Sequence, residues 1–122
     1  MRVKGIQHVN LNVADVERSR RFYQDVLGFA PSFAKDDTVW LDAGGDLLGL
    51  SRGEPPREHP NHWGFRVESG AEVNAWARHL TEHGAKLDKG PYDRSDGRSV
   101  YFRDPDGYLL EIFWVDPDLL AT

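Results

Sequence analysis

Polar and apolar residues alternate over residues 8–13, where the chain reads HVNLNV. The polar residues of this segment share one face and the apolar residues share the other, which is typical of a half-buried strand. Residues 62–67, HWGFRV, show the same alternation, and His62 takes the place of His8. Two segments with one pattern indicate an internal repeat.

A helix is predicted after each of these strands. Asp15 is a good N-cap for a helix that runs to about Leu27, and Gly28 follows as a helix C-terminus favours. In the second half the predicted helix begins at residue 69 or 70 and ends at Gly84. The spacing from the histidine to the glycine that follows the helix is therefore nearly the same in both halves.

Each half continues with three short strands, so that each half reads β-α-β-β-β. These strands are predicted near residues 30–35, 38–42 and 46–51 in the first half, and near 85–89, 98–103 and 108–115 in the second. The fold class is α+β, with one module over 1–53, a polar linker over 54–61 and a second module over 62–122. One helix covers only one face of each sheet, and we expect the two modules to form a cupped mixed sheet around a polar cleft.

Composition narrows the classes of function. The chain has 122 residues and a net charge of −5, with no run of Lys or Arg longer than two, which disfavours nucleic-acid binding. No apolar stretch approaches the roughly 18 residues that span a bilayer, so we expect no membrane partner and a cytoplasmic protein. The absence of cysteine excludes disulfides, thiolate metal sites and a Cys nucleophile.

Four positions correspond between the two halves, on the first and last strand of each. They are His8, Gly49, His62 and Glu111. Two imidazoles and a carboxylate form a metal-ligand set with open coordination positions. The competing interpretation, a solvated Glu111 and two hydrogen-bonded histidines, is less favoured because the placement is symmetric.

Other polar segments are weaker candidates. His79 and His83 are four residues apart on the second helix, a spacing that can bind a metal, but solvated helix residues are the favoured interpretation. His59 is expected to be exposed in the linker. Residues 95–99 are expected to form a hairpin loop, and Tyr101 lies on the same side of the following strand as Ser99.

The repeat, the segment RRFYQDVLGF and the segment YFRDPDGYLLEIF resemble the vicinal oxygen chelate superfamily. This superfamily includes glyoxalase I, extradiol dioxygenases, fosfomycin-resistance enzymes and bleomycin-binding proteins. The resemblance implies paired βαβββ modules and a divalent metal chelated together with vicinal substrate oxygens. It also implies a homodimer, in which modules often exchange. With exchange, His8 of one chain would join His62 and Glu111 of the other; without exchange, all three would come from one chain.

Departures within the resemblance narrow it further. Glyoxalase I typically has a fourth ligand, a carboxylate, where this chain has Gly49, which argues against a typical glyoxalase. The His-His-Glu set is similar to that of fosfomycin-resistance thiol transferases and extradiol dioxygenases. Ser95, Ser99 and Tyr101 match the potassium-loop region of the former, which implies a monovalent cation. Four features differ from the pattern of the fosfomycin-resistance enzymes and argue against fosfomycin as the substrate. They are Asn10, Leu47, Pro91 and the tail over residues 116–122, which lacks arginine.

The sequence therefore predicts a metal-dependent enzyme that acts on a small molecule, with the metal as Lewis acid on substrate oxygens. The predicted metal ligands are His8, His62 and Glu111, for Mn, Fe, Zn, Ni or Co. The predicted catalytic residues are Tyr101 and Asn10, and the predicted substrate-binding residues are Trp40, Phe113, Ser95, Ser99 and Arg66. A transferase or lyase is the first choice, an extradiol-type dioxygenase the second, and a drug-binding resistance protein without catalysis the third.

Overall fold

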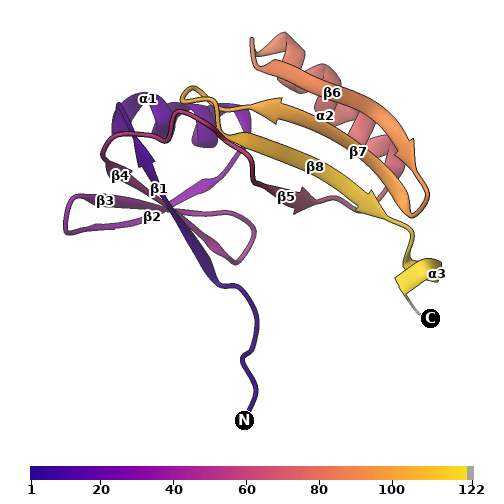
Figure 1. Cartoon of the computed structure of the whole chain (residues 1–122), viewed down its shortest axis with the longest axis horizontal. Helices are drawn as coiled ribbons and strands as arrows, with labels where there is room; N and C mark the ends of the chain where they lie inside the picture. The colour runs from indigo at the N-terminus through magenta and orange to yellow at the C-terminus, as the bar shows by residue number, and fades with distance from the viewer. Residues whose placement is uncertain (121–122) are drawn as a thin grey trace. The chain divides into compact units, whose positions relative to one another are not determined.

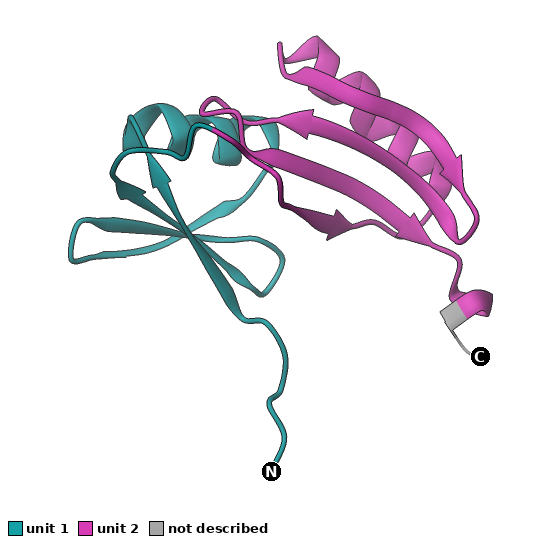
Figure 2. Ribbon diagram, in the orientation of Figure 1, with its two compact units in different colours: residues 1–57 teal, residues 58–122 magenta. Residues whose placement is uncertain are grey.

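The structure is a computed structural model that describes residues 1–120, so the last two residues of the predicted second module lie outside the described part. The chain divides into two compact units, residues 1–57 and 58–122, coloured separately in Figure 2. No helix among the described residues has the length and apolar character needed to cross a bilayer.

Unit 1 contains a four-stranded mixed sheet in the order β1-β4-β3-β2, with β1 and β4 parallel. Its elements in chain order are β1 (His8–Val13), α1 (Val16–Arg21), the π-helical turn η1 (Phe22–Val26), β2 (Ala30–Lys35), β3 (Thr38–Asp42) and β4 (Leu47–Arg52). The alternation in β1 is confirmed, because Leu11 and Val13 are buried whereas His8 and Asn10 are exposed.

The first helix begins as predicted and changes form before it ends. The carboxylate of Asp15 accepts a hydrogen bond from the backbone N–H of Arg18 at 3.1 Å, which caps α1. The backbone then widens into η1, and Gly28 follows with φ of 75°, a left-handed conformation that glycine adopts without strain. Buried residues of this stretch and of the sheet form the core of unit 1: Leu11, Val13, Ser19, Tyr23, Leu27, Leu41, Leu48 and Leu50.

Unit 2 repeats the arrangement with the sheet order β5-β8-β7-β6, in which β5 and β8 are parallel. Its elements are β5 (His62–Arg66), α2 (Gly70–Glu82), β6 (Lys86–Arg94), β7 (Gly97–Arg103), β8 (Leu109–Val115) and a short α3 (Pro117–Leu120), labelled in Figure 1. The hydroxyl of Ser69 caps α2 by accepting from the N–H of Glu72 at 3.2 Å, and Gly84 follows the helix with φ of 78°.

Helix α2 lies along one face of this sheet, and the opposite face carries the candidate site (Figure 1). The face toward α2 is apolar: its buried residues from β7 and β8 are Val100, Phe102, Leu110 and Ile112, which accompany Val73, Ala77 and Leu80 of the helix. Strand residues alternate between faces, so Ser99, Tyr101 and Glu111 point to the other side.

The turn between β7 and β8 is held by one side chain. Asp104 is only 5% exposed, and its carboxylate accepts from the backbone N–H groups of Asp106 and Tyr108, each at 2.9 Å. Gly107 completes the turn with φ of 91°. The predicted α+β class and the two βαβββ modules are confirmed, whereas β6 extends five residues beyond its predicted end and α3 was not expected.

Candidate metal centre

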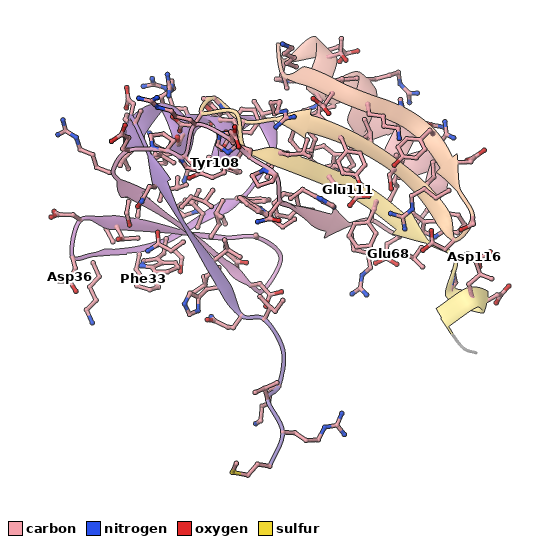
Figure 3. All side chains as sticks on the ribbon, in the orientation of Figure 1. Phe33, Asp36, Glu68, Tyr108, Glu111 and Asp116 are labelled. Carbon is pink, nitrogen blue, oxygen red and sulfur yellow. The ribbon has the colours of Figure 1, made fainter. Side chains whose placement is uncertain are left out.

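Two of the three predicted metal ligands meet in unit 2. Strand β5 pairs with β8 so that His62 lies opposite Leu109 and Gly64 lies opposite Glu111. His62 Nε2 is 3.3 Å from Glu111 Oε1. The His62 side chain is 41% exposed, whereas that of Glu111, labelled on β8 in Figure 3, is 6% exposed. A buried carboxylate thus presents one oxygen to an accessible imidazole.

The second oxygen of Glu111 is held by two donors. Ser99, fully buried on the neighbouring strand β7, donates to Oε2 at 2.6 Å, and Arg94 Nη1 donates to the same oxygen at 3.1 Å. Arg94 also forms a salt bridge with Asp96 at 2.8 Å. Burial lowers the pKa of Arg94, but the hydrogen bond and charge of Asp96, together with the charge of Glu111, outweigh burial and raise the pKa above its ordinary value. These contacts orient the carboxylate and leave Oε1 directed at His62.

Tyr101 lies beside the pair. Its hydroxyl is 3.5 Å from His62 Nε2, and the two rings meet edge to face with centroids 5.1 Å apart. The Tyr92 ring stacks on Tyr101 at 6.4 Å. Burial, followed by the charge of Glu111 and the nearness of Tyr92, raises the pKa of Tyr101 to about 12. The phenol is therefore a neutral hydrogen-bond donor at physiological pH.

A glycine keeps the face around Glu111 open. A Cβ on Gly64 would lie 2.8 Å from Phe113 Cδ1 and 3.2 Å from Glu111 Oε1. Phe113 pairs with Arg66 across β5 and β8, and Arg66 is exposed on the same face as His62. Ser95 lies exposed in the turn between β6 and β7, so this residue is separated from the buried Ser99 that contacts Glu111.

The third predicted ligand, His8, belongs to unit 1. It is exposed, and its Nδ1 is 2.8 Å from Gln7 Oε1, which leaves Nε2 as the outward nitrogen. The Trp40 ring meets the His8 ring edge to face at 5.5 Å. Asn10, on the same face of β1, accepts a hydrogen bond from Ser51 Oγ at 3.1 Å.

The Trp40 ring covers Gly49, the position in the first module that corresponds to Glu111 in the second. Gly49 pairs with Trp40 on the neighbouring strand, and a Cβ on Gly49 would lie 2.7 Å from Trp40 Cζ3. Phe33, half exposed, stacks on the other side of Trp40 with centroids 6.0 Å apart. The fourth symmetry-related position is thus filled by an indole ring, which explains why no side chain stands there.

The donor set in unit 2 fits a divalent metal. Adjacent ligands on one ion, at bonds of about 2.1 Å, are about 3.0–3.4 Å apart, and the observed separation of 3.3 Å falls in that range. An imidazole and an oriented carboxylate suit Mn, Fe, Zn, Ni and Co. Within the described part of the chain, no three His, Asp or Glu side chains come together as a metal-binding group. The structure therefore brings together two of the three predicted ligands, His62 and Glu111.

Sequence reasoning missed several contacts. Arg94 was not among the predicted site residues, because its strand was expected to end at residue 89. Phe33 and Ser51, which contact Trp40 and Asn10, were also missed; the strand alternation of β2 and β4 offered only a weak signal. The expectation that His59 is exposed is wrong, because its ring packs half-buried against Tyr108 with centroids 4.7 Å apart.

Comparison with known families adds to this geometry. The family model of the Glyoxalase/Bleomycin resistance protein/Dioxygenase superfamily matches residues 5–112. The chain belongs to this superfamily. The predicted resemblance is confirmed, and with it the paired-module fold.

Three similar proteins illustrate the range of activities within this superfamily. The metallothiol transferase FosB of Shouchella clausii is 32% identical, over 90% of this chain and 80% of that protein. The manganese-dependent 2,3-dihydroxybiphenyl 1,2-dioxygenase of Geobacillus genomosp. 3 is 27% identical over 88% of this chain and 35% of that enzyme. The structure of the fosfomycin resistance protein FosX of Mesorhizobium loti matches 99% of this chain and all of that one, with a TM-score of 0.81 and 24% identity, a likeness of fold. The prediction of a metal-dependent enzyme of this superfamily is confirmed, and a divalent metal is supported as its cofactor.

Proposed function

We propose that the chain is a metal-dependent transferase that adds a thiol to a small electrophilic substrate such as an epoxide. The observation that carries this proposal is the pair formed by His62 Nε2 and Glu111 Oε1, 3.3 Å apart on an open face. The similarity to a metallothiol transferase over most of both chains supports the choice of reaction.

The proposed metal ligands are His62, Glu111 and His8. Glu111 is oriented by Ser99 and Arg94, and His8 by Gln7, so these two ligands each have a neighbour that fixes the atom they present. A bound divalent ion supplies Lewis acidity toward the substrate oxygens. His8 belongs to the site in this proposal either from the same chain or from a second copy in a homodimer.

The remaining proposed residues bind and orient the substrate. In the reaction the thiol loses its proton, its sulfur forms a bond to an epoxide carbon, the carbon–oxygen bond breaks, and the oxygen takes up a proton. The Tyr101 hydroxyl donates a hydrogen bond to that oxygen as negative charge develops there. Asn10 is proposed to orient the substrate, Arg66 to attract an anionic group, and Trp40 and Phe113 to supply apolar walls. Ser99 is fully buried and in this proposal acts on the substrate site through Glu111, whereas Ser95 is proposed to border the substrate and to bind a monovalent cation.

The described cationic side chains near Tyr101 restrict the negative charge that we propose for the substrate. Arg94 is engaged by Asp96 and Glu111, and Lys89 Nζ lies 4.4 Å from the centre of the Tyr92 ring. Because Arg94 already has two anionic partners and Lys89 is directed at a ring, we propose a substrate with less negative charge than a phosphonate dianion. A neutral or singly charged epoxide meets this requirement.

A thiol-adduct assay tests the proposed reaction. The protein is incubated with Mn²⁺, with L-cysteine or glutathione, and with either fosfomycin or a neutral epoxide, and the product is measured by mass spectrometry. We expect the adduct of the neutral epoxide to form faster than that of fosfomycin, and both to disappear with a chelator or with Glu111→Ala. Absence of any metal-dependent adduct would overturn the proposal.

Mixing two inactive variants tests the origin of His8. His8→Ala and Glu111→Ala each remove one proposed ligand. If the site is shared between two chains, mixed dimers contain one intact site, and we expect activity to return on mixing. If the mixture stays inactive while each variant is folded, His8 comes from the same chain as Glu111.

An extradiol-type dioxygenase is the second candidate. Two histidines and one carboxylate also suit Fe(II) and Mn(II) oxygenases, and a manganese-dependent dioxygenase is among the relatives. This chain spans about a third (35%) of that enzyme. Oxygen consumption with a catechol and Fe(II) or Mn(II), in the absence of thiol, distinguishes this reaction from thiol transfer.

A further inference from the structure

Helix α2 carries a second pair of imidazoles, away from the candidate metal centre. His79 lies in the last turn of α2 and His83 is its C-cap residue, with ring centroids 4.1 Å apart and planes inclined by 36°. Residues four apart on a helix share one face, so both rings project to the same side. This helix packs on the sheet face opposite Glu111, so the two histidine sites are separate within unit 2.

The rings are held by neighbouring groups. His83 Nδ1 is 2.8 Å from the backbone carbonyl oxygen of His79, which leaves His83 Nε2 for another partner. The Trp76 ring meets His79 edge to face with centroids 5.2 Å apart, so His79 is bordered by Trp76 on one side and by His83 on the other. Side chains restrained in this way lose little freedom when they bind a ligand together.

The separation of the two rings suits chelation of one ion. Two imidazoles at right angles on one metal, with metal–nitrogen bonds of about 2.0–2.1 Å, have ring centres about 4.5 Å apart. The observed 4.1 Å is reached from that value by a small side-chain rotation. The C-terminal end of a helix also carries partial negative charge, which favours a cation at this position.

We propose that His79 and His83 form an auxiliary binding site for a borderline divalent ion such as Cu²⁺ or Zn²⁺, with water completing the coordination. Two imidazoles without a carboxylate bind Cu²⁺ and Zn²⁺ far more strongly than Mn²⁺, which stands lowest in the order of divalent affinities. The two sites therefore differ in metal selectivity: the site at Glu111 accepts Mn²⁺, whereas the helix pair does not.

Equilibrium dialysis of the whole chain against Cu²⁺ at pH 7.5 tests the proposal, with Mn²⁺ dialysed in parallel. We expect the double variant His79→Ala, His83→Ala to bind one equivalent of Cu²⁺ fewer than the wild type and the same amount of Mn²⁺. Electron paramagnetic resonance of Cu²⁺ bound to Glu111→Ala, which lacks a ligand of the other proposed metal site, should show coupling to nitrogen that weakens when His79→Ala and His83→Ala are added. An unchanged number of bound Cu²⁺ ions would overturn the proposal.

A variant with altered spacing is the matched control. Thr81→His combined with His83→Ala keeps two histidines on the helix, but residues two apart do not share a face. We expect its Kd for Cu²⁺ to rise about ten-fold or more, because the second imidazole no longer reaches the same ion. Equal affinity in this control and in the wild type would show that the two histidines act independently, which contradicts chelation. Because Mn²⁺ binding and the thiol-adduct assay depend on Glu111, these results are independent of the proposed function.

Discussion

The guanidinium of Arg94 holds the Glu111 carboxylate by the oxygen that faces away from His62. Arg94 Nη1 lies 3.1 Å from Glu111 Oε2, while His62 Nε2 lies 3.3 Å from Oε1. The carboxylate is almost fully buried, and these partners offset the free-energy cost of that burial. Arg94 is therefore the counter-ion of Glu111, and in the proposed metal site it also orients the carboxylate.

Removal of Arg94 should destabilise the metal-free protein. We expect Arg94→Ala to lower the free energy of unfolding by about 1–3 kcal/mol, because a buried carboxylate loses a charged donor. Added Mn²⁺ should recover part of this loss, because the ion replaces the missing positive charge. Urea unfolding with a chelator and with Mn²⁺ measures both effects.

Arg103 provides the control for this variant. It belongs to the neighbouring strand and pairs with Asp88 at 3.1 Å, but both side chains are about a third exposed. Arg103→Ala should change stability by less than about 1 kcal/mol, with no dependence on Mn²⁺. Equal losses in the two variants would contradict a specific role for Arg94 at Glu111.

Two serines of one hairpin should respond differently to substitution. Ser99 is fully buried and donates to Glu111 Oε2 at 2.6 Å, whereas Ser95 is exposed in the turn. Ser99→Ala should cost about 1.5–3 kcal/mol, the range for a hydrogen bond to a charged group, and should weaken Mn²⁺ binding. Ser95→Ala should change neither, and thermal unfolding with metal titrations compares the two. A loss of K⁺ stimulation in Ser95→Ala alone would support a monovalent cation at the turn.

The repeat explains why most of the fold was predictable from the sequence. Strand alternation, the cap at Asp15 and the glycines after both helices are local signals, and the structure has each at its predicted position. Of the two predicted start residues of the second helix, Ser69 is its N-cap and Gly70 its first residue. Strand β6 was harder because Gly90 and Pro91 normally interrupt a strand. At this sheet edge the pairing with β7 shifts register between Lys89 and Tyr92, which lets β6 continue to Arg94.

The candidate site was predictable only in part, because local patterns assign residues to faces of a strand but do not fix side-chain contacts. Strand alternation places Ser99 and Tyr101 on one face of β7, and the register with β8 adds Glu111, which pairs with Tyr101. It does not tell which oxygen of Glu111 each neighbour contacts, nor that Trp40 covers Gly49, because these depend on side-chain packing between strands. Arg94 was not predicted as a site residue because it lies in the part of β6 that extends beyond the predicted strand.

Gly49 should resist substitution because of Trp40. A Cβ at this position would lie 2.7 Å from the indole, and Phe33 and His8 border the ring, so it cannot move away freely. We expect Gly49→Ala to lower the free energy of unfolding by about 1–3 kcal/mol. In a Trp40→Ala background the same substitution should cost much less, and a double-mutant cycle by urea unfolding measures the difference. Additive losses of unfolding free energy would show that contact with Trp40 is not the reason why position 49 requires glycine.

Tyr101 should act in catalysis and contribute little to folding. Its hydroxyl is 3.5 Å from His62 Nε2, and its raised pKa of about 12 keeps it protonated at physiological pH. Tyr101→Phe should lower kcat for thiol addition by about 10²-fold, because the lost hydrogen bond acts mainly on the charge that develops in the transition state. Mn²⁺ affinity and stability should stay within about 1 kcal/mol of the wild type, since the ring remains packed against Tyr92. Tyr92→Phe, which removes the hydroxyl of the stacked ring, should lower kcat less than Tyr101→Phe does. A Tyr101→Phe enzyme with unchanged kcat but a raised KM would instead assign the hydroxyl to ground-state binding of the substrate.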